Sequence, residues 1–136
     1  MKKICSYTIL FLSIYFLFSC SNDDDNSTEN MDFAELVIGE WERTSETIDG
    51  QASSSNCATG LKVNFGADGT YGESPFSGNC TNTSASGIYS VNGSVIEIST
   101  AFGFDTYEIV TLSTNSLVYN FTSSSGSTTE RTYSKL

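Results

Sequence analysis

Clusters of glycine, asparagine, aspartate and serine recur every eight to twelve residues from residue 39 onward, and the runs between them are rich in β-branched and aromatic residues. Short runs of this composition between turn-forming clusters are typical of β-strands. Because no helical segment separates these runs, the pattern indicates an all-β domain. The predicted strands cover 39–48, 59–66, 69–74, 85–91, 94–100, 104–112, 116–122 and 128–135.

Eight short strands in succession favour a small up-and-down antiparallel barrel, with a β-sandwich as the alternative. A short helix is expected ahead of the first strand, because Asp32 and Glu35 have the spacing of a capping box. Residues 33–136 are enough for one modest core and no second domain, so they are predicted to form a single barrel domain.

The segment 87–99 contains the clearest hairpin of the chain. An Asn-Gly pair at 92–93 favours a type I′ turn, whose twist suits a two-residue hairpin loop. The register that follows pairs Tyr89 with Ile96. Strict alternation then places four residues on the inner face of the barrel, namely Tyr89, Val91, Ile96 and Ile98.

The orientation of Glu108 depends on how the next hairpin is built. A two-residue turn at Thr114 and Asn115 would place Glu108 inside the barrel, where burial would raise its pKa and mark a site. A bulge would instead turn Tyr107 and Ile109 inward and expose Glu108. The spacing of Ile109, Leu112 and Leu117 resembles that of the lipocalin-like domain of bacterial lipoproteins, and this resemblance favours the bulge and leaves the first arrangement open.

The N-terminus has the features of a secretory signal. Lys2 and Lys3 precede an apolar run that is too short for a membrane span of about 20 residues. Residues 17–20, Leu-Phe-Ser-Cys, resemble the lipobox of bacterial lipoproteins, in which the cysteine is acylated and becomes the first residue of the mature chain. The prediction is a signal peptide at 1–19 and a membrane anchor through acyl chains on Cys20.

An acidic segment follows the predicted anchor. Residues 21–32 contain five acidic residues and one apolar residue, too little apolar surface to fold, so 20–32 is predicted to be a lipidated, solvated tether. Acidic residues directly after the cysteine resemble the export tag of surface-exposed lipoproteins in some Gram-negative bacteria. A tether held away from anionic lipid by its own charge is the alternative.

Charge and cysteine content narrow the possible partners and compartments. Loss of the two N-terminal lysines leaves four bases against 16 acids, a net charge of −12, and no basic patch, so nucleic acid is excluded as a partner. Cys57 and Cys80 remain once Cys5 is removed and Cys20 acylated, and in an oxidising compartment they are predicted to form a disulfide. The chain has no histidine, and two thiols alone do not complete a zinc site, so no metal is expected.

Several short motifs, taken in their order along the chain, resemble those of the lipocalin-like domain of bacterial lipoproteins. They are Gly39-Glu40-Trp41 after a short helix, Phe65 to Tyr71, Gly87-Ile88-Tyr89, Ile109 to Leu117, and Tyr133-Ser134-Lys135. The resemblance covers residues 33 to the end. It implies that Gly39 and Trp41 close the base of the barrel, and that Arg131 from the last strand packs on the Trp41 ring through a cation–π contact.

No catalytic residue or cofactor is predicted. Without histidine or a free thiol, the Ser-His-Asp and Cys-His arrangements are excluded, and no phosphate-binding or dinucleotide-binding motif occurs. A pair of carboxylates could serve a glycosidase, and the acidic residues inside the central strands are Glu97, Asp105 and Glu108.

Aromatic residues are the candidate ligand-binding groups, because they could line a pocket or fill the interior of so small a barrel. The candidates are Phe65, Tyr71, Tyr89, Tyr119, Phe121 and Tyr133. The first hypothesis is a lipid-anchored, extracytoplasmic binding module for a small hydrophobic or amphiphilic molecule. The second is a structural or interaction lipoprotein with a filled barrel, whose polar loops contact an envelope protein or a glycan. A cavity in the barrel distinguishes the two.

We predict that Cys20→Ala detaches the protein from the membrane, because acyl chains on this sulfur are the proposed anchor. The measurement is the partition of the protein between washed membranes and the soluble fraction. A Cys20→Ala protein that stays in washed membranes would contradict acylation at this position.

Overall fold

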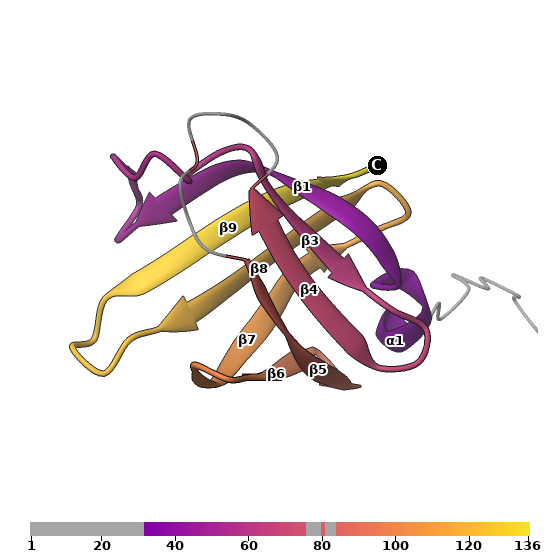
Figure 1. Ribbon diagram of the computed structural model, residues 1–136. Coiled ribbons are helices and arrows are strands. Elements are labelled where there is room, and N and C mark those ends of the chain that lie inside the picture. The colour runs from indigo at the N-terminus through magenta and orange to yellow at the C-terminus, as the bar shows by residue number, and fades with distance from the viewer. Residues whose placement is uncertain (1–31, 76–79, 81–83) are drawn as a thin grey trace, which may run out of the picture. The chain divides into compact units, whose positions relative to one another are not determined.

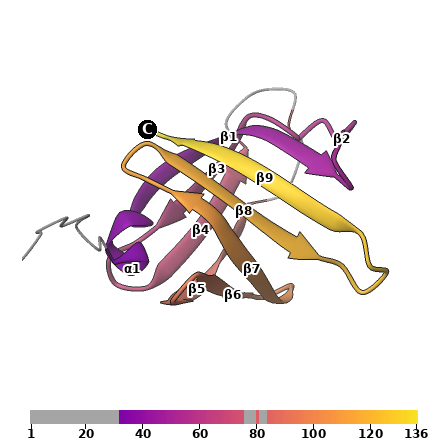
Figure 2. The same cartoon turned by 180° about the vertical axis from the view of Figure 1, so that it is seen from behind.

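In the computed structural model the first strand pairs with both the second and the last strand of the barrel, so the sheet closes on itself. The structure describes residues 32–75, 80 and 84–136, and these show the predicted antiparallel barrel (Figures 1 and 2). The predicted signal peptide, Cys20 and the tether up to residue 31 lie outside the described residues. The barrel strands are β1 (Gly39–Ile48), β3 (Leu61–Phe65), β4 (Thr70–Pro75), β5 (Ala85–Asn92), β6 (Val95–Thr100), β7 (Gly103–Leu112), β8 (Ser116–Thr122) and β9 (Thr128–Lys135).

All eight predicted strands are present, with ends that differ from the prediction by at most two residues. The prediction missed one further strand, β2 (Gln51–Ala52), which folds back on the end of β1. The connecting residues Asp49 and Gly50 both have positive φ, at 51° and 78°. An Asp-Gly pair is a hairpin signal, so this short strand could have been recognised from the sequence.

A short helix, α1 (Phe33–Leu36), covers one end of the barrel (Figure 1). Asp32 caps it by accepting a hydrogen bond from the backbone N–H of Ala34 at 3.0 Å. Trp41 is fully buried beneath the helix, and its indole N–H donates to the Val37 carbonyl at 2.7 Å. Lys135 lies 4.8 Å from the centroid of the Trp41 ring and donates to the Leu36 carbonyl. Trp41 therefore closes the base together with α1.

The predicted contact between Arg131 and Trp41 is wrong. The register of β1 and β9 places Lys135 opposite Trp41 and Arg131 opposite Glu46, near the other end of the strand. The Arg131 guanidinium lies 5.0 Å from the centroid of the Phe121 ring instead. The cation on Trp41 must come from the strand position beside it, and in this chain that position is a lysine.

The predicted inner face of the β5–β6 hairpin is confirmed, but the predicted register is wrong by two residues. Val91 pairs with Ile96 and Tyr89 with Ile98, so the turn is formed by Gly93 and Ser94 rather than by 92–93. Gly93 has a φ of 60° at the first turn position. A shift of two residues keeps each side chain on its own face, because side chains alternate with a period of two.

A bulge in β7 decides the orientation of Glu108. The register between β7 and β8 shifts between Ile109 and Thr111, so Val110 has no partner of its own. Tyr107 and Ile109 are buried on the inner face, and Glu108 is exposed. The structure thus confirms the bulged arrangement and excludes an inward carboxylate at Glu108.

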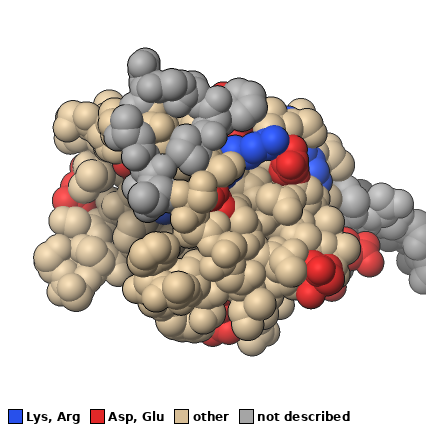
Figure 3. Space-filling model, viewed as in Figure 1, with Lys and Arg blue, Asp and Glu red and all other residues tan. Residues whose placement is uncertain are grey.

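The described surface is sparsely charged. Most of the face in Figure 3 is neither acidic nor basic, and its acidic side chains are dispersed. Glu40 and Lys62 form an ion pair at 2.7 Å on the outside of β1 and β3. No helix among residues 32–75, 80 and 84–136 is long and apolar enough to cross a membrane.

Gly87 and Gly72 offer a matched test of the barrel wall. A Cβ atom on Gly87 would collide with the Ser99 carbonyl of the neighbouring strand, whereas a Cβ atom on Gly72 would have open space. We expect Gly87→Ala to lower the free energy of unfolding by about 1–3 kcal/mol, as overpacking does. Gly72→Ala should leave it unchanged or raise it slightly. Urea denaturation measures both values, and equal stability of the two variants would contradict the packing of β5 against β6.

Candidate functional site

Aromatic side chains fill the half of the barrel interior nearest α1. The Phe65 ring lies 5.5 Å from the Tyr71 ring and 4.9 Å from the Tyr89 ring, measured between centroids. The Tyr89 hydroxyl donates to the Gly66 carbonyl at 2.9 Å, which satisfies its polar end. This half of the interior is therefore packed.

A second layer crosses the middle of the barrel. Tyr119, Tyr133 and Arg43 come from β8, β9 and β1, and each is at most 4% exposed. The Tyr133 hydroxyl accepts hydrogen bonds from Nε and a terminal nitrogen of Arg43 at 3.1 and 3.0 Å. With both lone pairs occupied, it donates its own proton to the Tyr119 hydroxyl at 2.7 Å. Burial raises the pKa of Tyr133 well above its usual value, so the Tyr133 hydroxyl keeps its proton and can serve as the donor in this layer.

Glu46 forms ion pairs with two arginines, Arg43 of this layer and Arg131 of β9. Its Oε2 accepts hydrogen bonds from Arg43 at 3.2 Å and from Arg131 Nε at 2.8 Å. Burial alone would raise the pKa of Glu46, but the hydrogen bonds, chiefly that from Arg131, lower it below its ordinary value. A bulge in β1 between Arg43 and Ser45 brings Arg43 and Glu46 to the same side of the strand, although they are three residues apart.

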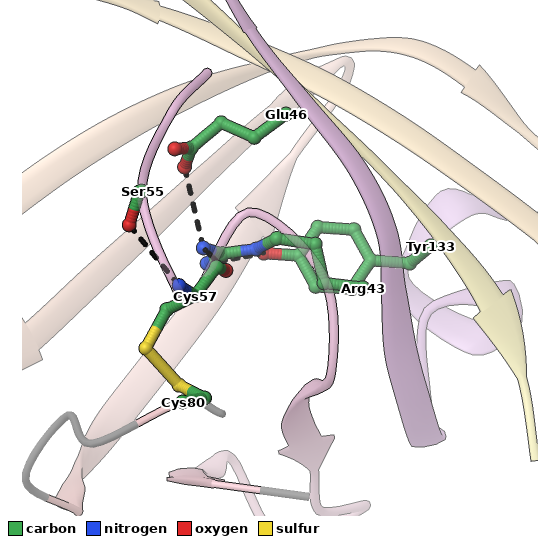
Figure 4. The surroundings of a disulfide bond; sticks show 6 residues. All are labelled: Arg43, Glu46, Ser55, Cys57, Cys80 and Tyr133. Carbon is green, nitrogen blue, oxygen red and sulfur yellow. Dashed lines mark hydrogen bonds and ion pairs between the residues drawn. A yellow bond between two sulfur atoms is a disulfide. The ribbon is translucent and has the colours of Figure 1, made fainter. Parts of the chain in front are cut away.

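The predicted disulfide is confirmed, and it is attached to this buried cluster (Figure 4). Cys57 and Cys80 are bonded, with their Cα atoms 4.5 Å apart. The Cys57 carbonyl accepts a hydrogen bond from Arg43 at 3.1 Å, and its N–H donates to the Ser55 hydroxyl at 3.2 Å. The hydrogen bond to the Cys57 carbonyl therefore attaches the loop before β3 to an arginine inside the barrel, at the end opposite α1. The disulfide joins Cys80 to the same loop.

An open cavity of about 260 Å³ remains at the mouth of the barrel, at the end opposite α1. Tyr71, Tyr107 and Ile98 are the buried residues of its wall, and Phe102 stands at its rim, where 78% of its surface is exposed. The Tyr71 hydroxyl donates to Glu73 Oε2 at 2.8 Å. The lining residues are Tyr71, Glu73, Ala85, Ile98, Thr100, Phe102, Asp105 and Tyr107.

The structure places the six aromatic candidates for ligand binding in two different environments. Tyr71 lines the cavity. The others contribute to the packed interior: Phe65, Tyr89, Tyr119, Phe121 and Tyr133. The prediction missed Tyr107 as a lining residue, although the bulged arrangement of β7 already pointed it inward. It also missed Glu73, which the alternation of β4 places on the same face as Tyr71.

The lining residues combine an apolar surface with a few polar groups. The aromatic rings and the Ile98 and Ala85 side chains provide the apolar part, and Thr100, Glu73 and Asp105 provide hydrogen-bonding groups. Small-molecule sites in proteins have this composition. Among the described residues, no three histidine, cysteine, aspartate or glutamate side chains are gathered as a metal site would require.

Comparisons with known proteins agree with this geometry. A family model described as "Lipocalin-like domain" matches residues 37–119. A lipocalin-like protein from Bacteroides uniformis has a similar solved structure, with a TM-score of 0.58 and 20% identity over 74% of this chain and 98% of that one. An uncharacterized protein from Bacteroides eggerthii is similar with a TM-score of 0.56 and 12% identity, over 74% and 99%. No curated protein matches the chain.

Glu46→Gln tests the buried charge cluster. Removing the carboxylate leaves Arg43 buried without a counter-charge, which should lower the free energy of unfolding by about 3 kcal/mol. Glu40→Gln is the control, because Glu40 is 53% exposed in its pair with Lys62, and loss of such a surface pair should cost about 0–1 kcal/mol. Urea denaturation at neutral pH compares the two, and equal losses would contradict the buried cluster.

The same cluster predicts a dependence of stability on pH. Because the pKa of folded Glu46 lies below the unfolded value of 4.5, its stabilising contribution is complete above that value and is lost as the pH falls through the folded pKa. Glu46→Gln should therefore lose less stability on acidification below pH 4.5 than the parent protein. Parallel pH profiles for the two proteins would show that Glu46 is not held by its arginines.

Proposed function

Because this chain belongs to the family of lipocalin-like domains, we propose that it is a non-catalytic binding module that holds a small amphiphilic molecule at the mouth of its barrel. The cavity of about 260 Å³ is the observation that carries this proposal. Its volume is just below the range of about 300–1,000 Å³ that is usual for ligand pockets, so the ligand is smaller than a typical drug molecule. The packed interior beneath it confines the ligand to the mouth.

The proposed module works outside the cytoplasm, held to the outer membrane by acyl chains on Cys20. The short apolar run before Cys20 and the acidic segment after it support this placement. The Cys57–Cys80 disulfide also supports it, because such bonds persist in oxidising compartments. Exposure on the cell surface is the further proposal that rests on the acidic segment.

A structural or interaction lipoprotein is the second candidate function. The observation in its favour is the layer of Tyr119, Tyr133 and Arg43, whose buried, hydrogen-bonded side chains cross the middle of the barrel. In that case the polar loops at the mouth would contact an envelope protein or a glycan, and the cavity would be part of that contact surface.

Ala85→Trp separates the two functions. Ala85 lines the cavity, so an indole at this position should fill it and displace a small molecule. Ser86→Trp is the matched control, because the adjacent Ser86 is exposed on the outer face of the same strand. Native mass spectrometry of the full chain, purified from the cells that produce it, detects a bound molecule directly.

We expect the parent protein and Ser86→Trp to carry a small molecule that Ala85→Trp lacks. Ligand-free spectra for all three proteins would count against the binding function. A molecule bound equally by all three would contradict the placement of the ligand in the mouth cavity.

A further inference from the structure

We infer that the mouth cavity selects a positively charged ligand, an amphiphile with a protonated amine or a quaternary ammonium group. The ligand class deepens the proposed binding function and rests on it. Two carboxylates enter the cavity wall from strands that are not neighbours, Glu73 from β4 and Asp105 from β7. Between them the wall contains the uncharged side chains of β5 and β6, namely Ala85, Ile98 and Thr100.

The protein supplies no ion-pair partner for these carboxylates within the described residues. Beyond residue 30 the sequence contains four bases, and each is engaged elsewhere. Arg43 and Arg131 bind Glu46, Lys62 binds Glu40, and Lys135 lies on Trp41 at the base. The sequence of the segment 76–83, which joins β4 to β5, contains no base.

The contacts of Glu73 leave it available to a ligand. One carboxylate oxygen of Glu73 accepts a hydrogen bond from the Tyr71 hydroxyl. This donor is neutral, so it does not neutralise the negative charge of the carboxylate. Asp105 is exposed where it borders the cavity. A cation entering the cavity would therefore meet two negative charges without displacing an internal partner, whereas an anionic head group would be repelled by both.

Aromatic rings in the cavity wall are the second feature that favours an ammonium ligand. Tyr71, Tyr107 and Phe102 border the cavity, and ring faces attract ammonium groups as well as apolar bodies. Burial raises the pKa of both Tyr71 and Tyr107 above the ordinary tyrosine value, and the neighbouring Tyr119 adds to the effect. Their hydroxyls are therefore neutral, and an ammonium group can donate hydrogen bonds to them.

Three probes with the same phenyl body and different head groups test this inference: 2-phenylethylamine, 2-phenylethanol and phenylacetate. Isothermal titration calorimetry of each into the full-length protein in detergent, at low ionic strength, gives the affinities. We expect the amine to bind about tenfold more tightly than the alcohol, as a charge-assisted hydrogen bond would give. Phenylacetate should bind most weakly, and added salt should reduce the preference for the amine.

Substitutions of Glu73 and Asp105 test whether these two carboxylates cause the selectivity for the amine. Glu73→Gln and Asp105→Asn should each weaken amine binding by about fivefold to tenfold and leave binding of the alcohol unchanged. Glu108→Gln is the matched control, because it removes an acidic residue from the outer face of the same strand as Asp105. It should bind all three probes as the parent protein does.

The outcomes distinguish this inference from the function on which it rests. Equal affinity for the three probes, or a preference for phenylacetate, would contradict the inference that the cavity selects amines. Neither result would contradict the proposed binding function. Amine selectivity that survives both Glu73→Gln and Asp105→Asn would overturn the assignment to these residues. If no probe binds and the native protein also carries no small molecule, the inference and the proposed function both fail.

Discussion

The pairing of β1 with both β3 and β9 determines what the barrel can contain. It closes the sheet, so the inward side chains of eight strands share one narrow interior. It also brings the bulged part of β1 beside β9, where Arg43 meets Tyr133 and Glu46 meets Arg131. A small barrel of this kind is filled by side chains, and here part of the filling is a charged cluster whose buried polar atoms all have partners among the described residues.

This filling places the candidate site at the mouth. α1 and Trp41 close one end, and the layer of Tyr119, Tyr133 and Arg43 crosses the middle. The cavity lies between the ends of β4 to β7 that are opposite α1, beside Tyr71 and Tyr107. The disulfide supports the same end of the barrel through the bond between the Cys57 carbonyl and Arg43. The cavity and the disulfide thus lie at the same end of the barrel.

Sequence patterns predicted the strands because alternation and turn residues act locally. They predicted the inner face of the β5–β6 hairpin even though its register was misassigned, since a shift of two preserves the faces. They could not locate the cation beside Trp41, because that depends on the register between β1 and β9, which are far apart in sequence. The bulge in β1 was equally invisible, so Glu46 was not recognised as an inward residue. Arg43 was recognisable in principle, because it stands two positions after Trp41.

A crystal structure of the full chain, purified from its own cells with whatever it carries, tests the central claim that the barrel binds at its mouth and nowhere deeper. The account predicts density for a small molecule in contact with Tyr71 and Tyr107, beside Glu73 and Asp105, with the bond between Tyr119 and Tyr133 intact. Density between Tyr119 and Tyr133, or an interior opened by movement of Arg43, would contradict it.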